Sequence, residues 1–176
     1  MRHGSVFKMV VATAALENNT ITTKTTVNDT GIYPRGHNPA CWIYTSRHYG
    51  HGYLNVTEAI KKSCNYFFYE LGYKMGIDPV IKYAKSYGLG IKTGIELSGE
   101  SKGIVDLKDY CKETTGQEWQ FGDTLSAVIG QSYNSYTPIQ IARYTSMLAN
   151  GGKSVDVTLI KSIIDSDGNK VPKDEN

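Results

Sequence analysis

The chain has 176 residues, which is enough for one domain with a sizeable core. Its net charge of +2 gives no electrostatic case for nucleic acid as a partner. No apolar run reaches the roughly 18 residues that span a bilayer, and the odd count of three cysteines excludes a fully paired disulfide framework.

The first predicted element is a helix over residues 4–17. Ser5 and Lys8 are three residues apart, so they share one face of this helix and their tips can meet. Most of the other positions are apolar, so we expect the helix to be buried nearly all round. Burial lowers the pKa of a lysine, and a neutral lysine can take the proton of a serine hydroxyl and create a nucleophile. Because Ser-x-x-Lys is expected about once by chance in a chain this long, the pair alone is weak evidence.

The middle of the chain is predicted to be irregular at first and helical later. Residues 20–30 are rich in β-branched side chains and are expected to be extended. Residues 31–52 show no clear period, and a loop of this length usually has a function or a tether. Three helices are expected next, over residues 55–63, 65–75 and 78–87; Asn55 and Glu58 form a capping-box pattern, and Asp78-Pro79 starts the third helix.

The last part of the chain is predicted to hold three more helices and a hairpin. Residues 89–99 form a glycine-punctuated turn and a short extended piece. Helices are expected over residues 107–116, 123–129 and 137–149, the last with Thr137 and Gln140 as a capping box. Residues 155–164 alternate as a strand does, and residues 165–168 have the composition of a hairpin turn. The chain is therefore predicted to be mainly α.

A second candidate site is Ser63-Cys64-Asn65, at the corner between two predicted helices. Ser63 and Asn65 would place a hydroxyl and an amide on the same side of the corner. Such a pair can relay a proton and hold a substrate amide. Serine and asparagine are also common at helix corners as simple caps, and on composition alone capping is the stronger interpretation.

The order of these two motifs and the residues around them resemble a class B penicillin-binding protein of the cell-elongation type, a peptidoglycan D,D-transpeptidase. The resemblance runs from Gly4 to about Asp167. Its most specific segments are residues 50–52, 58–60, 63–72, 88–90, 93–97, 122–125, 129–131, 137–143 and 149–152.

The resemblance implies an acyl-transfer site. Ser5 would be the nucleophile that is acylated by a peptidoglycan stem peptide or a β-lactam, and Lys8 would be its general base. Ser63 and Asn65 would complete the proton relay and the substrate contacts, and the backbone N–H of Ser5 would be one of two oxyanion donors. No cofactor is implied for catalysis. Cell-wall elongation proteins are the implied partners, and the outer face of the cytoplasmic membrane is the implied location of the parent protein.

The resemblance also implies that the chain is part of a larger domain. The family's third motif, Lys-Thr-Gly or Lys-Ser-Gly, lies on a strand that follows the Ala-Asn-Gly-Gly helix end, and so would fall beyond Asn176. Lys92-Thr93-Gly94 has the sequence of this motif, but it precedes that helix and matches a turn of the family instead. His3 stands where the family usually has proline. We expect residues 1–176 to be the helical lobe of the β-lactamase/transpeptidase-like α/β fold, with a C-terminal β-hairpin and little of the central sheet. We expect such a piece to be acylated poorly on its own.

Four residues are candidate ligands of a structural zinc ion. Asp29, Cys41, His51 and Cys64 are separated by gaps too wide for a compact zinc-knuckle signature, so isolated buried cysteines and a loop histidine are the simpler interpretation. A zinc tether would, however, hold the long segment 31–52. Some elongation-type relatives carry zinc on Asp, Asp, His and Cys, which resembles this set with Cys41 in place of the second Asp. His37 and His48 are the rival histidines.

Two other functions remain open from the sequence. One is a β-lactam sensor or β-lactamase of the same fold, which hydrolysis of β-lactams by the parent would favour. The other is a non-catalytic helical module that binds partner proteins, for which loss of Ser5 would have no consequence.

Overall fold

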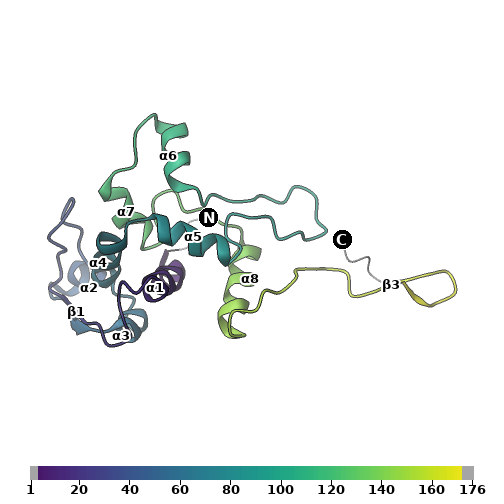
Figure 1. The fold of residues 1–176 in the computed structure, drawn as a ribbon, viewed down its shortest axis with the longest axis horizontal. Coiled ribbons are helices and arrows are strands. Elements are labelled where there is room, and N and C mark those ends of the chain that lie inside the picture. The colour runs from purple at the N-terminus through teal and green to yellow at the C-terminus, as the bar shows by residue number, and fades with distance from the viewer. Residues whose placement is uncertain (1–3, 172–176) are drawn as a thin grey trace.

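A computed structural model describes residues 4–171, which are mainly helical (Figure 1). The helices are a 3₁₀ turn η1 (Gly4–Phe7), α1 (Lys8–Glu17), α2 (Trp42–Arg47), α3 (Val56–Lys61), α4 (Asn65–Met75), α5 (Asp78–Ser86), α6 (Leu107–Thr115), α7 (Phe121–Ala127) and α8 (Pro138–Ala149). The strands are β1 (Val27–Asp29), β2 (Gly52–Leu54), β3 (Ile163–Ile164) and β4 (Lys170–Val171). None of these helices is long and apolar enough to cross a bilayer.

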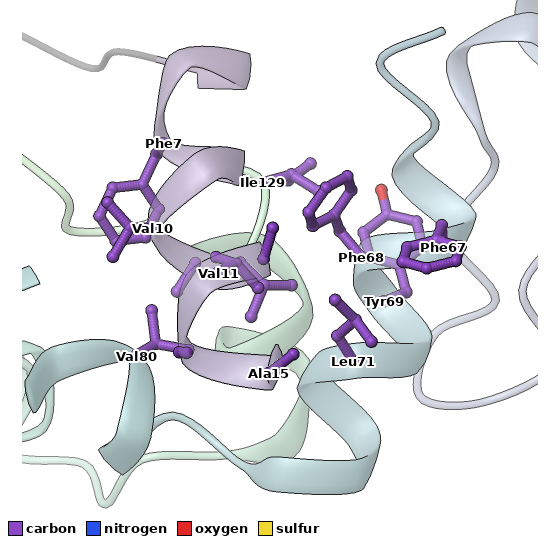
Figure 2. Close-up of a cluster of buried hydrophobic side chains, with 14 of the residues drawn as sticks. Phe7, Val10, Val11, Ala15, Phe67, Phe68, Tyr69, Leu71, Val80 and Ile129 are labelled. Carbon is purple, nitrogen blue, oxygen red and sulfur yellow. The ribbon is translucent and has the colours of Figure 1, made fainter. Parts of the chain in front are cut away.

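Helix α1 lies at the centre of the helical body and contacts α3, α4 and α5. Figure 2 shows Val11 of α1 on the side of Phe68 and Leu71 of α4, and Val10 on the side of Val80 of α5. All five side chains are fully buried. Complete burial of such a side chain stabilises the fold by about 1.5–3 kcal/mol. The prediction of a helix buried nearly all round is confirmed, and its first turn is a tighter 3₁₀ turn.

Most helix boundaries follow the start signals in the sequence. The Asn55–Glu58 capping box is present at α3, and that of Thr137 and Gln140 is present at α8. Two starts differ from the prediction. Helix α7 begins at Phe121, because the Asp123 carboxylate lies inside its first turn and accepts the Gln120 N–H. Asp78 lies within α5 and does not cap it; its carboxylate instead accepts a hydrogen bond from Lys108.

The sequence predicts the secondary structure of segment 20–52 only in part. Only Val27–Asp29 of the expected extended stretch is a strand, and it pairs antiparallel with Gly52–Leu54. The expected irregular loop contains the six-residue helix α2, which is too short for its period to be recognised. The register sets Asp29 opposite Gly52. Gly50 lies so close to this strand that a Cβ there would be 2.0 Å from the Asp29 carbonyl oxygen, so only glycine fits.

Residues 153–171 form an arm that extends away from the helical body (Figure 1). The hairpin at residues 165–168 is confirmed, but its strands are only two residues each, so the strand predicted over residues 155–164 is mostly wrong. The arm contacts the loop over residues 89–101 through Glu96, whose carboxylate accepts the Thr158 hydroxyl and, at 2.9 Å, the Leu159 N–H. Alternating apolar residues do not make a long strand where no second strand is available to pair with them.

Candidate active site

The first turn of the central helix presents Ser5 at the surface of the body. Ser5 is exposed, whereas Phe7 and Lys8 behind it are buried. The turn is held by the Gly4 N–H, which donates to the Gly130 carbonyl at 3.2 Å. A Cβ on Gly130 would lie 2.0 Å from the Gly4 carbonyl oxygen, so glycine is required for this close approach.

The side chains of Ser5, Lys8, Ser63 and Asn65 converge. The Lys8 ammonium donates to the Ser63 carbonyl at 2.8 Å, to the Ser63 hydroxyl at 3.1 Å and to the Asn65 side-chain oxygen at 2.6 Å. The Ser63 hydroxyl donates to the Ser5 hydroxyl at 2.7 Å. The structure therefore brings together all four residues predicted from the two motifs, although they are up to 60 positions apart in the chain.

The contact between Ser5 and Lys8 is indirect, which corrects the prediction that their tips meet. Among residues 4–171 the Ser5 hydroxyl bonds to Ser63 and not to Lys8. The three donors of the Lys8 ammonium are all directed at the α3–α4 corner, so the hydroxyl of Ser63 stands between the two.

The corner geometry depends on local backbone conformation. Ser63 has a positive φ of 50°, which turns the chain sharply after α3. The Cys64 sulfur caps α4 by accepting the Phe67 N–H, so this corner is both a cap and a candidate site. Asn65 is the first residue of α4 and its side chain is free to reach Lys8.

Burial changes the protonation of Lys8. Its side chain is only 2% exposed, and burial lowers the pKa of Lys8 to about 8, with nearby sulfur charges opposing the shift. Near neutral pH a useful fraction of Lys8 is therefore neutral and can accept a proton. When Lys8 is neutral, the two hydroxyls can rotate so that Ser5 donates to Ser63 and Ser63 donates to Lys8. The Ser5 proton can then move to Ser63 as Ser63 passes its own to Lys8.

A cavity of about 350 Å³ opens onto these groups. It is lined by Gly4, Ser5, Trp42, Ser63, Asn65, Ile129 and Gln131. Reasoning from the sequence missed Trp42, because it lies in the segment with no clear period. It also assigned no role to Gln131, although the segment Ile129-Gly130-Gln131 was among the most specific ones.

The four candidate zinc ligands form one cluster beneath this corner. One donor atom from each of Asp29, Cys41, His51 and Cys64 lies within 4.8 Å of the others. His51 Nδ1 lies 2.7 Å from Asp29 Oδ2 and 3.6 Å from Cys41 Sγ. The two sulfur atoms are 3.9 Å apart. Both cysteines are unpaired and buried.

Hydrogen bonds within the cluster favour negative charge there. Burial opposes ionisation of Asp29, but bonds from His51 and the Gly31 N–H lower the pKa of its carboxyl overall. The hydrogen bond from Cys64 lowers the pKa of the Cys41 thiol to about 6. The pKa of Cys64 is raised, because it is the partner that keeps the shared proton.

Other candidate residues lie outside both groups. His37 and His48 are exposed, and neither belongs to the cluster found among residues 4–171. Lys92, Thr93 and Gly94 lie in a loop, where the N–H groups of Thr93 and Gly94 donate to the Glu100 carboxylate. The structure thus places this early Lys-Thr-Gly in a turn rather than on a strand.

Comparison with known proteins identifies the family. A family model described as the penicillin binding protein transpeptidase domain matches residues 1–176. The chain belongs to the penicillin-binding protein transpeptidase family. Peptidoglycan D,D-transpeptidase MrdA of Haemophilus influenzae is 35% identical over 162 residues, which cover 90% of this chain and 24% of that protein. MrdA of Escherichia coli K12 is 34% identical over 168 residues, 96% of this chain and 26% of that protein.

Solved structures agree with this family. Penicillin-binding protein PBP2 of Helicobacter pylori, in a complex with MreC, has a TM-score of 0.82 and 35% identity over 89% of this chain and 29% of that chain. PBP2 of Pseudomonas aeruginosa, in complex with WCK 5153, has a TM-score of 0.83 and 32% identity over 97% of this chain and 39% of that chain. The resemblance to an elongation-type class B penicillin-binding protein is confirmed, and the chain spans about a quarter of the length of these MrdA relatives.

Proposed function

We propose that residues 1–176 are the helical part of the transpeptidase domain of a peptidoglycan D,D-transpeptidase, and that Ser5 carries the acyl group. The observation that supports this most is the chain of hydrogen bonds from Ser5 through Ser63 to the buried Lys8. Such a chain activates a hydroxyl as a nucleophile only when the final base is neutral, and burial of Lys8 provides that condition.

In the proposed first step, Ser5 Oγ attacks a peptide carbonyl carbon of the stem peptide and forms a C–O bond. The Ser5 proton passes through Ser63 to Lys8, and the carbonyl oxygen becomes an oxyanion. The N–H of Ser5 is one donor toward it, since an N–H in the first turn of a helix has no acceptor within the helix. When the C–N bond breaks, the proton goes to the leaving amine.

In the second step an amine of another stem peptide attacks the ester carbon of the acyl-enzyme. A new C–N bond forms, the C–O bond breaks, and the amine proton returns to Ser5 through the same residues. A β-lactam would acylate the same oxygen by opening its ring, so its amine stays attached and does not leave. Asn65, whose oxygen is taken by Lys8, offers its amide N–H₂ to a substrate carbonyl.

Covalent labelling tests this proposal. In the full-length protein, Ser5→Ala removes the nucleophile and is expected to abolish labelling by a fluorescent penicillin on denaturing gels. Ser98→Ala, an exposed serine in the loop over residues 89–101, is the matched control and should label like the wild type. Labelling that persists in Ser5→Ala would contradict the proposal. Rapid turnover of the bound drug by the wild type would favour a β-lactamase instead.

The family also suggests ligands, partners and a location for the parent protein. We propose stem peptides and β-lactams as ligands, cell-wall elongation proteins as partners, and the outer face of the cytoplasmic membrane as the place of action. The MrdA relatives are named peptidoglycan D,D-transpeptidases, and the Helicobacter pylori relative was solved with MreC. Co-purification of the full-length protein with an elongation protein of the same cell would test the partner.

We further propose that Asp29, Cys41, His51 and Cys64 hold a structural zinc ion. Two thiolates on tetrahedral zinc, each about 2.3 Å from the metal, would lie about 3.8 Å apart. The observed sulfur separation is 3.9 Å. Carboxylate, imidazole and thiolate are all zinc ligands, and the negative charge of the carboxylate and thiolate groups favours a bound cation. When bound, the ion would tie the segment 31–52 to the corner that carries Ser63 and Asn65.

Elemental analysis tests the zinc proposal. We expect about one zinc per chain in full-length protein purified without chelator. Cys41→Ala should lose the metal, whereas Cys111→Ala should keep it, because Cys111 contacts Tyr133 and Gln117 away from the cluster. Protein that contains no zinc and has three freely titratable thiols would contradict this assignment.

A further inference from the structure

The cavity at Ser5 continues past Asn65. A second cavity of about 460 Å³ is lined by Ala40, Trp42, Thr45, Ser46, Asn65, Tyr69, Ile129 and Gln131. Trp42, Asn65, Ile129 and Gln131 line both cavities. The two are therefore parts of one cleft, which leads from the nucleophile across the Asn65 amide and onto the surface of α2 and α4.

This extension of the cleft carries no charge. Its polar groups are hydroxyls and amides, and burial raises the pKa of the Tyr69 hydroxyl to about 12, so Tyr69 is neutral as well. A charged ligand group would lose water here without gaining a partner. The extension therefore suits an uncharged polar group, such as the amide of a peptide-like ligand.

Gln131 is the side chain best placed to recognise such an amide. It is exposed, lines both parts of the cleft, and forms no side-chain hydrogen bond with residues 4–171. A glutamine amide offers both a donor and an acceptor, which complements the C=O and N–H of a peptide bond. Asn65 lies in the same cleft and offers N–H₂ donors, since its oxygen is taken by Lys8.

The backbone of Gln131 is fixed before any ligand arrives. Asn134 is 1% exposed, and its side chain donates to the carbonyls of Gln131 at 2.7 Å and of Ala127 at 3.0 Å. The Tyr136 hydroxyl donates to the Asn134 oxygen at 2.8 Å. A residue on a fixed backbone loses less conformational freedom when it binds, so more of its hydrogen-bond energy contributes to affinity.

Trp42 faces the same cleft as an apolar wall. Trp42 is 44% exposed, while its Nε1 donates to the Lys62 carbonyl at 3.1 Å and its ring makes a T-shaped contact with His51. The indole is thus oriented from one side and open on the other. An apolar group next to the recognised amide would bury its surface there.

We propose that Gln131 determines specificity by hydrogen-bonding the secondary amide that the acyl group on Ser5 carries. The inference rests on the proposed acyl transfer and names a further part of its substrate. Two ligands share this chemistry: the peptide backbone of a stem peptide, and the acylamino side chain of a β-lactam. Both enter the cleft at Ser5, and both present a neutral amide to the region beyond Asn65.

Paired acylation rates test the inference in the full-length protein. Second-order acylation constants are measured for benzylpenicillin, which has a side-chain amide, and for 6-aminopenicillanic acid, which has the same rings without it. Loss of an uncharged hydrogen bond should make Gln131→Ala about tenfold slower with benzylpenicillin. With 6-aminopenicillanic acid the rate should change less than about twofold, since no amide is there to lose. Gln117→Ala, an exposed glutamine on the loop after α6, is the matched control and should change neither rate.

A second assay, with a stem peptide as substrate, distinguishes the two ligands. With a synthetic N-acylated stem pentapeptide, Gln131→Ala should raise KM about fivefold while kcat changes little, because the contact exists before and during the reaction. An effect in both assays assigns the contact to both ligands. An effect with benzylpenicillin alone assigns it to the side chain of the drug.

Equal slowing with both penicillins, or no slowing with either, would overturn the role of Gln131. Equal slowing would show a general distortion of the site rather than lost recognition. A wild-type protein that neither penicillin acylates would instead overturn the proposed acyl transfer, so the two failures are distinguishable.

Discussion

The helical body around Ser5 and the arm over residues 153–171 use similar apolar side chains to very different effect. Phe67 in the body is fully buried, whereas Ile164 in the arm is 65% exposed. In the body the apolar side chains of α1 meet other helices, because α1 is covered by α3, α4 and α5. Among the described residues, the arm bonds to the rest of the chain at its start, where the Arg143 guanidinium donates to the Ser154 hydroxyl, and further along through Glu96. Apolar composition therefore indicates burial only where a second surface lies within reach.

The same difference applies to polar groups. Lys8 is buried with three acceptors at hydrogen-bond distance, and its chemistry follows from that enclosure. The lysines of the arm, Lys161 and Lys170, are exposed and show no such environment.

Replacing the buried lysine should have the largest effect. In the full-length protein, Lys8→Met should slow acylation by penicillin about a thousandfold, within the range that general bases contribute. Lys161→Met in the arm is the matched control and should leave the rate unchanged. Stopped-flow or gel-based labelling measures both, and comparable rates for the two variants would remove Lys8 from the proposed relay.

Core truncation should separate the two regions in stability. In the 176-residue chain, Phe67→Ala should lower the free energy of unfolding by about 3–5 kcal/mol, since it leaves a cavity in the α4 core. Ile164→Ala should change it by less than about 0.5 kcal/mol, because the side chain is already exposed. Urea unfolding followed by circular dichroism measures both. Similar values for the two would mean that the arm packs more closely than the structure shows.

The pH dependence of acylation should report the enclosure of Lys8. Burial lowers the pKa of Lys8 to about 8, and only the neutral amine accepts a proton. Below this pKa the acylation rate should therefore rise about tenfold per pH unit, and it should level off above it. Labelling rates between pH 6 and 10 check the sign and the position of the bend. A rate that still rises steeply from pH 8 to pH 10, as the ordinary lysine pKa of 10.5 would give, would show that Lys8 is solvated.

Releasing the arm should have the smallest effect. Glu96→Ala removes the acceptor of the Thr158 and Leu159 bonds. Cleavage within residues 153–171 by a nonspecific protease should become about threefold faster, because local opening then costs less. The melting temperature should stay within about 1 °C, since the core is untouched. Glu113→Ala, an exposed acid in α6, serves as the control. An unchanged cleavage pattern would show that Glu96 does not tether the arm.

The amino-acid sequence by itself indicated most of the helices and the two candidate motifs. Capping residues such as Asn55 and Thr137 specify where α3 and α8 begin, because they act within one turn of the chain. The apolar run of α1 specified its burial, and the ordered motifs indicated the family. Caps and apolar runs are local signals, and the family signal adds up over many positions, so all of them can be recognised without knowledge of the fold. The roles of Ser5, Lys8, Ser63 and Asn65 stay predictions until acylation is measured.

Only the tertiary structure decided which of these residues meet. That Ser63 stands between Ser5 and Lys8 depends on how α1 packs against the α3–α4 corner, across more than 50 residues of chain. The pairing of Val27–Asp29 with Gly52–Leu54, which completes the cluster of Asp29 and His51, is equally long-range. Short elements such as α2 lack a readable period, and their conformation is set by packing rather than by propensity. The sequence supplied the chemical groups, and packing between distant segments supplied their distances.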